Sequence, residues 1–184
     1  AQGHPLRNFN EFLNLNSRVV RGVDVAVSYD FDTAIGDFHT MLDWSRLTRF
    51  DVSPSSASAE LLAAGLPATA GGSLLERDDK PRNRASATFS WRRGDVGATL
   101  FARYVGEVKD STALDYPVDD WLFFNVSGSY TLRSGWLDAT TVRLGVNNVL
   151  NEDPPLADEP FGYYASLHDN RGRYWYLQFT KSFE

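Results

Sequence analysis

The chain has no cysteine and a single methionine among its 184 residues. Without cysteine it can form neither a disulfide framework nor a thiolate metal site. It also lacks any run approaching the ~20 apolar residues that a membrane helix needs, and its mean hydropathy is −0.34. These absences exclude helical membrane spans only, because a membrane β-barrel turns half of its residues toward water.

Excess positive charge is also absent, since 18 basic residues face 24 acidic ones and the net charge is −6. This balance argues against nucleic acid as a partner. No G-x-S-x-G, H-E-x-x-H or phosphate-loop motif occurs, so we expect no catalytic residues and no cofactor. The three histidines are far apart in the sequence and have no metal-ligand spacing, so we expect no metal site.

The first residues, AQGHPLRNFN, contain neither a basic start nor an apolar run. They do not resemble a signal peptide. We therefore expect that a signal peptide has been removed, or that the chain begins partway through a longer protein.

The final stretch, GRYWYLQFTKSF, alternates between apolar and polar residues. Trp175, Leu177 and Phe179 fall on one side of this pattern, and Tyr174 and Gln178 fall on the other. Successive side chains of a strand point to opposite faces. The pattern predicts a closing strand with one apolar face and one polar face.

Similar alternation recurs along the chain, and it predicts strands at residues 19–31, 37–50, 84–91, 96–108, 121–132, 139–147 and 172–183. Short and long connections alternate between these strands. The short turns are one that ends at Gly36 and those at residues 92–95 and 133–138. The long segments are residues 51–83, 109–120 and 148–170. Within the first long segment, residues 59–64 could form one or two helical turns before Gly65.

This alternation of short and long connections is typical of outer-membrane barrels, whose long loops all lie on the external side. The predicted strands also approach the ~9–11 residues that cross a bilayer when tilted. Near the short turns, a set of large apolar residues suits an aromatic girdle at the periplasmic headgroups: Tyr29, Phe31, Phe38, Trp91, Tyr130, Leu132 and Phe183. The polar faces carry charges that could form ion-pair ladders along a lumen or contact ligand: Asp24, Asp30, Asp37, Asp43, Arg84, Arg92, Arg103 and Arg143.

Five segments, in this order, resemble the C-terminal end of TonB-dependent outer-membrane receptors: RGVDVAVSYDF, KPRNRASATFSW, ARYVGEV, VRLGVNNVLNEDPP and GYYASLHDNRGRYWYLQFTKSF. The resemblance spans nearly the whole chain, and its last two segments are the most specific. It implies an all-β fold, an antiparallel up-and-down transmembrane barrel of 22 strands with a plugged lumen. It also implies location in the outer membrane of a Gram-negative bacterium and import of scarce nutrients such as siderophore-bound iron, cobalamin or carbohydrate. Outer-membrane lipid and the TonB energy-transducing complex are the implied partners.

Only about seven of those strands are predicted here, and we find neither a plug nor a segment that engages TonB. A barrel with both termini in the periplasm needs an even number of strands, so an odd count leaves a partner missing. We therefore expect residues 1–184 to be the C-terminal portion of a receptor barrel, with residues 1–16 as an irregular lead-in.

Candidate sites follow from this interpretation. The three long segments are the expected ligand-contacting loops, and within them Tyr163, Tyr164 and His168 are the candidate contacts. The resemblance implies that Phe183 helps the insertion machinery recognise the last strand, although a girdle aromatic is the alternative. The acidic loops lack the spacing of a Ca²⁺ site and are expected to be solvated.

Two other functions remain open at this point. One is a complete eight-stranded outer-membrane barrel with a structural or adhesive role, which requires residues 1–16 to form a strand. The other is a soluble β-barrel that binds a ligand and turns its apolar faces inward.

Overall fold

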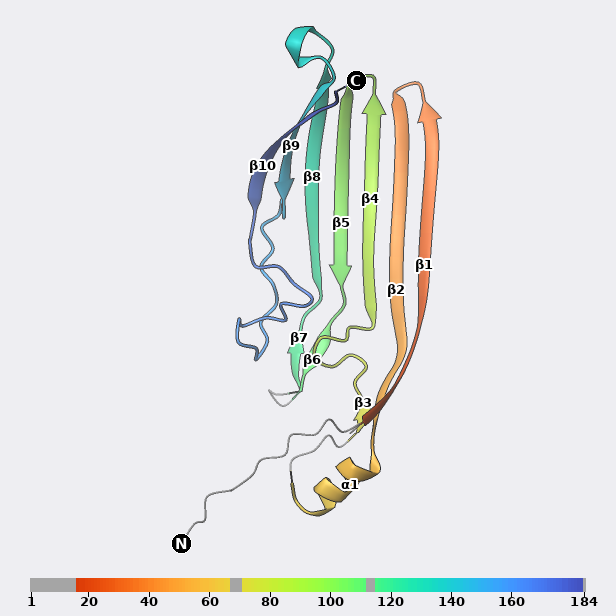
Figure 1. The fold of residues 1–184 in the computed structure, drawn as a ribbon, viewed down its shortest axis with the longest axis vertical. Coiled ribbons are helices and arrows are strands. Elements are labelled where there is room, and N and C mark those ends of the chain that lie inside the picture. Colours follow the sequence, from red (N-terminus) through yellow and green to blue (C-terminus); the bar gives the residue numbers. More distant parts are fainter. Residues whose placement is uncertain (1–15, 67–70, 112–114, 184) are drawn as a thin grey trace.

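The computed structural model describes residues 16–66, 71–111 and 115–183. The expected lead-in at residues 1–16 lies outside this range except for Asn16, which begins the first strand. Seven long strands form one antiparallel sheet, and their spatial order follows the chain (Figure 1). They are β1 (Asn16–Thr33), β2 (Gly36–Pro54), β4 (Asn83–Arg93), β5 (Val96–Val105), β8 (Trp121–Leu132), β9 (Thr140–Asn147) and β10 (Tyr174–Lys181). The predicted all-β, antiparallel up-and-down fold is confirmed.

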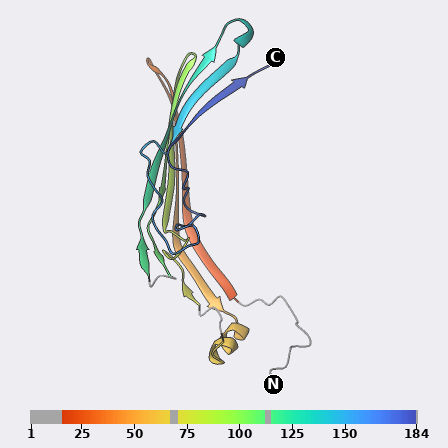
Figure 2. The same ribbon diagram turned by 90° about the vertical axis from the view of Figure 1, so that its left-hand side faces the viewer.

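The sheet is a single curved layer when it is turned by 90° (Figure 2). Strands β1 and β10 are its two edges, and within the described residues each pairs on one side only. The barrel is therefore open, as expected for about seven strands of a larger one. Each free edge carries unpaired backbone groups, so closure requires further strands.

The short turns lie at one end of the sheet together with the end of β10, and the long connections lie at the other end (Figure 1). One short turn contains a 3-10 helix, η1 (Gly135–Leu137). We name the two ends the turn end and the loop end. The separation predicted from connection lengths is confirmed.

The first long connection contains the expected helical turns as α1 (Ser56–Ala63). The helix begins at Ser55, whose side chain accepts a hydrogen bond from the Ser58 N–H at 3.2 Å, and Gly65 with a positive φ of 70° follows its end. A two-residue strand, β3 (Gly72–Ser73), then pairs with β2. No helix among the described residues is long and apolar enough to cross a membrane.

Some predicted boundaries are wrong. Strand β5 ends at Val105 and does not continue to residue 108. Gly106 still donates its N–H to the carbonyl of Asn83, the residue it faces, at 2.9 Å, and Val108 then begins a different strand. Residues 109–120, expected to be loop only, contain part of a small ribbon formed by β6 (Val108–Asp110) and β7 (Tyr116–Val118). Strands β1 and β2 are longer than predicted at the loop end, and β10 is shorter than the predicted 172–183.

The apolar sides of the seven alternations form one continuous surface, which we name the outer face. Residues directly opposed in neighbouring strands lie on the same face, and the register aligns one such row across the sheet: Phe31, Phe38, Trp91, Ala98, Gly128, Leu144 and Leu177. Many large apolar side chains of this face are solvent-exposed. The seven strands therefore do not enclose an apolar core, which argues against a soluble barrel with inward-facing apolar residues.

The outer face of β4 carries no charge between Asn83 and Arg93. The ten residue-to-residue steps from Asn83 to Arg93 span roughly 33 Å along the strand, or roughly 23 Å across the membrane at the usual ~45° tilt. That height is close to the ~25 Å apolar band of outer-membrane barrels.

A β-bulge marks the loop-end limit of the outer face. The register of β1 and β2 shifts between Arg21 and Gly22, so one residue of β2 is left without a partner. Beyond the shift, Arg49 lies opposite Arg21 on the outer face, while Phe50 and Val52 turn to the other side. The polarity of β2 therefore reverses where the chain leaves the apolar band.

The opposite surface, which we name the inner face, separates its charges by strand. Between the bulge and the turn end, β1 and β2 contribute five acids, and β4, β5 and β9 contribute four arginines: Asp24, Asp30, Asp32, Asp37, Asp43, Arg84, Arg92, Arg103 and Arg143. Beyond the bulge, β1 adds Arg18, which faces Val52. The predicted ion-pair ladders are wrong, since Asp30 alone among the predicted charges is in an ion pair of the described chain, with His39 at 2.7 Å. The register explains this, because Asp43 opposes Ser86 and only Asp37 faces an arginine directly.

Candidate ligand-binding site

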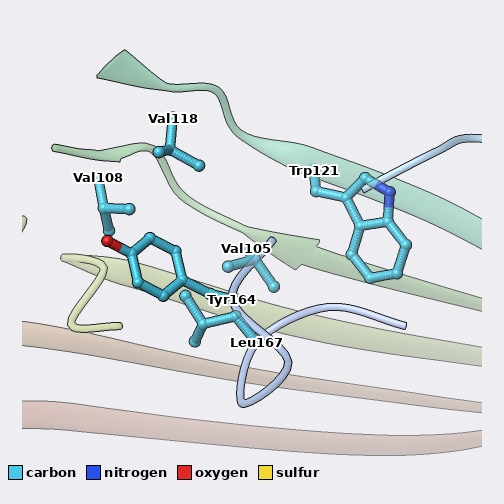
Figure 3. Close-up of a cluster of buried hydrophobic side chains, with 6 residues drawn as sticks. All are labelled: Val105, Val108, Val118, Trp121, Tyr164 and Leu167. Atoms are coloured by element: carbon cyan, nitrogen blue, oxygen red, sulfur yellow. The ribbon is translucent and has the colours of Figure 1, made fainter. Parts of the chain in front are cut away.

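A small buried core fixes the loop end (Figure 3). It comprises Val105, Val108, Val118, Trp121, Tyr164 and Leu167. Val105 and Trp121 lie on the inner face of β5 and β8, where they oppose each other. The third long connection, between β9 and β10, therefore packs against the inner face at the loop end. We name this cluster the loop core.

Local hydrogen bonds around Asn148 direct that connection. Asn148 has a positive φ of 50°, a conformation that asparagine tolerates well. Its N–H donates to the Asn125 side chain at 2.8 Å, and its own side chain bonds the backbone N–H and carbonyl of Glu152 at 2.9 and 2.8 Å. The Asn-rich VNNVLN segment therefore forms a rigid turn that sends the chain back over the inner face.

The packed connections form an open cavity of about 510 Å³, which we name the loop cavity. It is lined by carboxylates, hydroxyls and aromatic rings: Asp78, Asp79, Ser111, Glu159, Pro160, Phe161, Tyr163, Tyr164, Ala165 and Ser166. All three long connections contribute residues to this lining. Aromatic rings and hydrogen-bonding groups converging in one concave space are the usual composition of a small-molecule site.

Asp78 joins the three connections that form the cavity. Its Oδ1 accepts hydrogen bonds from the N–H and hydroxyl of Ser111 at 2.9 and 2.7 Å, and from the Tyr164 hydroxyl at 3.4 Å. Its backbone N–H donates to the carbonyl of Lys109 at 2.9 Å. Next to it, a hydrogen bond from Lys80 to Asp79 lowers the pKa of the Asp79 carboxyl. The cavity wall is thus held by hydrogen bonds and keeps negative charge.

The three predicted contacts occupy different surroundings. Tyr163, half-buried, and Tyr164, buried, both line the loop cavity. Burial, and then the nearby carboxylates of Asp110 and Asp78, raise the pKa of Tyr164, so its hydroxyl stays a donor at neutral pH. His168 does not line this cavity and lies buried edge-on against the Trp121 ring, with 5.3 Å between ring centroids.

His168 is uncharged at neutral pH. Burial, together with the nearby positive charges of Arg103 and Arg84, lowers its pKa to about 4. Its Nδ1 is buried without a hydrogen-bond partner in the described part of the chain. This histidine is thus part of the packing behind the cavity wall. Its predicted ligand contact stays a prediction, as do those of Tyr163 and Tyr164.

Phe183, the predicted assembly signal, lies at the turn end of the sheet. Phe183 is exposed just beyond β10, with the Lys181 ammonium 5.7 Å from its ring centroid. Of the other predicted girdle residues, Phe31 and Phe38 stack across neighbouring strands with ring centroids 4.9 Å apart. The ring centroid of Phe38 also lies 5.4 Å from that of Phe89, which is not a predicted girdle residue. The roles of Phe183 in assembly and of these rings as a girdle stay predictions.

Sequence reasoning placed the site in the three long connections but did not single out Asp78, Asp79, Glu159 or Phe161. Nothing in their local sequence distinguishes them from solvated loop residues, because the contacts that gather them join segments far apart in the chain. Across residues 16–66, 71–111 and 115–183, no group of three or more His, Asp or Glu side chains could hold a metal ion.

A family model described as "TonB dependent receptor-like, beta-barrel" matches residues 2–149. The match covers six of the seven long strands, all but β10. No curated protein and no solved structure matches the chain.

Proposed function

The chain belongs to the TonB-dependent receptor-like β-barrel family, whose members are outer-membrane transporters and not enzymes, and from this we propose that it is the C-terminal part of a receptor that imports a small-molecule nutrient. In this proposal the outer face contacts lipid and the inner face lines the lumen. The loop end faces the cell exterior and the turn end faces the periplasm.

The observation that carries the proposal is the difference between the two faces of one sheet. An uncharged, exposed apolar band covers the outer face, whereas acids and arginines occupy the inner face. A single-layer sheet with these two faces is stable where lipid covers the first and water the second.

The loop cavity gives this receptor a place to capture its ligand. It lies at the loop end, its volume of about 510 Å³ suits a small molecule, and hydrogen bonds that Ser111 donates to the Asp78 carboxylate fix its wall. We propose Tyr163 and Tyr164 as ligand contacts there. The nutrient classes are siderophore-bound iron, cobalamin or a carbohydrate.

Transport in this proposal is driven by the TonB complex of the inner membrane, which acts through a plug encoded outside this chain. Ligand held by the loops passes through the lumen once the plug is displaced. The two free sheet edges support the participation of further strands, since β1 and β10 each need a neighbour.

Uptake by the host tests the function. A strain with the intact gene, a gene deletion and a tonB deletion are each grown with one limiting nutrient: a panel of ferric siderophores, cobalamin, or oligosaccharides. We expect one nutrient to support growth only when both genes are present, and surface-added protease to cleave the loop-end connections. Growth of the deletion strain on every nutrient, or recovery of the protein without detergent, would overturn the proposal.

A further inference from the structure

A second cavity lies on the inner face beneath the third long connection. Its volume is about 190 Å³, and we name it the wall cavity. It is lined by Arg103, Trp121, Phe123, Asn125, Asn147, Asn148, Asp169, Arg171, Gly172 and Tyr174. None of these residues lines the loop cavity. The two cavities are therefore separate sites on the same end of the sheet.

The charges of the wall cavity leave one arginine uncompensated. Arg171 is neutralised locally, since its Nε and Nη2 both bond the carboxylate of Asp169, at distances from 2.5 to 3.0 Å. Arg103 takes part in no ion pair or hydrogen bond of the described chain, although it is half-buried. The lining therefore carries a net charge of +1.

No carboxylate of the described chain forms an ion pair with Arg103, although Asp43, one strand beyond Ser86, lines a neighbouring small cavity together with Arg103. The acids of the inner face lie on β1 and β2, whereas Arg103 lies on β5, opposite Phe123 and Ser86. Its nearest charged neighbour on the same face of β4 is Arg84, which bonds the carbonyl of Asp79 at 3.2 Å. A half-buried guanidinium without a carboxylate is costly, and a bound anion removes that cost.

Other lining groups are also donors without acceptors. The Asn125 Oδ1 is occupied by the Asn148 N–H at 2.8 Å, so the part of Asn125 that remains available is its amide nitrogen. The Trp121 side chain is only 4% exposed, and its indole N–H has no acceptor among the described residues. In Figure 3 this nitrogen lies on the side of the ring that faces away from the other five side chains. The accessible lining thus offers the Asn125 amide donor and one free positive charge, whereas the Trp121 N–H itself is buried.

We propose that the wall cavity binds a single carboxylate group of the transported ligand, with the Arg103 guanidinium as its charge partner. A carboxylate accepts two parallel hydrogen bonds from a guanidinium and cancels one charge. Inorganic phosphate matches the net +1 of the lining only as its monoanion, and it has no apolar body to fill the rest of the cavity. The rings of Phe123 and Tyr174 provide apolar walls for the body that carries the carboxylate.

This assignment rests on the proposed uptake function and names the chemistry of its ligand. The order of the sites suggests how a ligand enters, because the loop cavity is formed by the connections and the wall cavity lies on the barrel strands. A ligand with a carboxylate would pass from an aromatic, acidic entrance to a single arginine on the lumen wall.

Binding of benzoate to the complete receptor in detergent micelles tests the proposal. Tryptophan indoles are labelled with ¹⁵N, and Trp121→Phe identifies the Trp121 signal. We expect benzoate to shift this signal in a saturable way, whereas uncharged benzamide and inorganic phosphate leave it unchanged. Arg103→Gln should weaken benzoate binding roughly tenfold or more, because a charge-assisted hydrogen bond is lost.

Two further variants control the result. Arg103→Lys keeps the charge without the planar fork and should lie between the wild type and Arg103→Gln. Arg143→Gln removes an arginine of the same face that does not line the wall cavity, and should bind benzoate normally. Three results would each overturn the proposal: no shift of the Trp121 signal with benzoate, an equal shift with benzamide or phosphate, or unchanged benzoate affinity in Arg103→Gln. If an Arg103 variant fails to assemble, the responses of the wild-type receptor to benzoate, benzamide and phosphate still test whether the wall cavity binds a carboxylate.

This equilibrium measurement needs neither TonB nor transport. Loss of TonB-dependent uptake in a receptor that still binds benzoate would contradict the proposed function alone. Intact uptake without benzoate binding would contradict only the proposal that the wall cavity binds a carboxylate.

Discussion

The two faces of the sheet are made from the same strands, but they differ in what covers their side chains. The outer face carries exposed apolar side chains that no other part of the described chain covers. The inner face is polar along most of its length, yet at the loop end it supports the loop core. The outer face thus depends on the surrounding medium, whereas the loop end of the inner face is packed by the chain itself. The following predictions test this difference.

The largest effect is expected in the loop core. Leu167 is 2% exposed, and Leu167→Ala should destabilise the packed connection by about 2–5 kcal/mol, because it leaves a cavity against Val105 and Trp121. Amide hydrogen exchange over residues 156–168 of the complete protein measures this. Leu156→Ala is the matched control, since Leu156 belongs to the same connection but is 72% exposed, and it should have little effect. Equal exchange in both variants would mean that the connection is not packed on the inner face.

A pair of neighbouring residues on β2 compares the two faces directly. Leu42 lies on the outer face and Met41 on the inner face, and they have similar exposure, at 43% and 39%. Leu42→Arg should cost about 2–4 kcal/mol in a bilayer, because the charge enters the lipid core, while Met41→Arg should cost much less. Denaturant unfolding of the receptor in lipid vesicles measures both. Similar costs at the two positions would contradict the assignment of the faces.

The loop core should weaken at low pH through His168. Its pKa falls from 6.5 to about 4 on burial, so the packed form excludes a proton that the released form binds. Packing is therefore fully stable above pH 6.5 and is lost progressively as the pH falls toward 4, by about 2 kcal/mol at pH 5. Hydrogen exchange of the connection at pH 7 and pH 5 measures the loss. His168→Leu should remove the pH dependence, whereas His39→Leu, at the turn end, should retain it.

The smallest effect is expected for the acidic part of the inner face. The Asp30–His39 pair is exposed, so Asp30→Asn should change the free energy of unfolding by less than about 1 kcal/mol. Asp24→Asn, on the same strand and without an ion pair among the described residues, is the control. A larger loss in Asp30→Asn alone would show that ion pairs stabilise this face after all.

The strands could be predicted because each carries its own signal. Alternation such as Val23, Val25 and Val27 on β1 identifies both the strand and its apolar side, and antiparallel pairing of neighbours then aligns those sides across the sheet. Boundaries were less accurate, since residues 108–110 do not extend β5 but pair with residues 116–118 in a separate ribbon, which local sequence does not reveal.

The site was predicted only as a set of loops. Asp78 lies far along the chain from Ser111 and Tyr164, and only the fold shows that its carboxylate joins them. The sequence identified the charges of the inner face but not their separation by strand, which depends on the register. Val105, an apolar residue on the inner face of β5, is explained by the loop core that it helps to form.

The most direct test of the account is lipid accessibility along β2. Single cysteines at positions 38–44 can each carry a spin label in the complete receptor reconstituted into vesicles, after any cysteine outside this cysteine-free chain has been replaced by serine. We predict an alternation with period two, in which labels at even positions are relaxed by oxygen dissolved in lipid and labels at odd positions by a water-soluble nickel chelate. Even positions that respond to the chelate and not to oxygen, or no alternation at all, would contradict a lipid-facing outer face and with it the receptor interpretation.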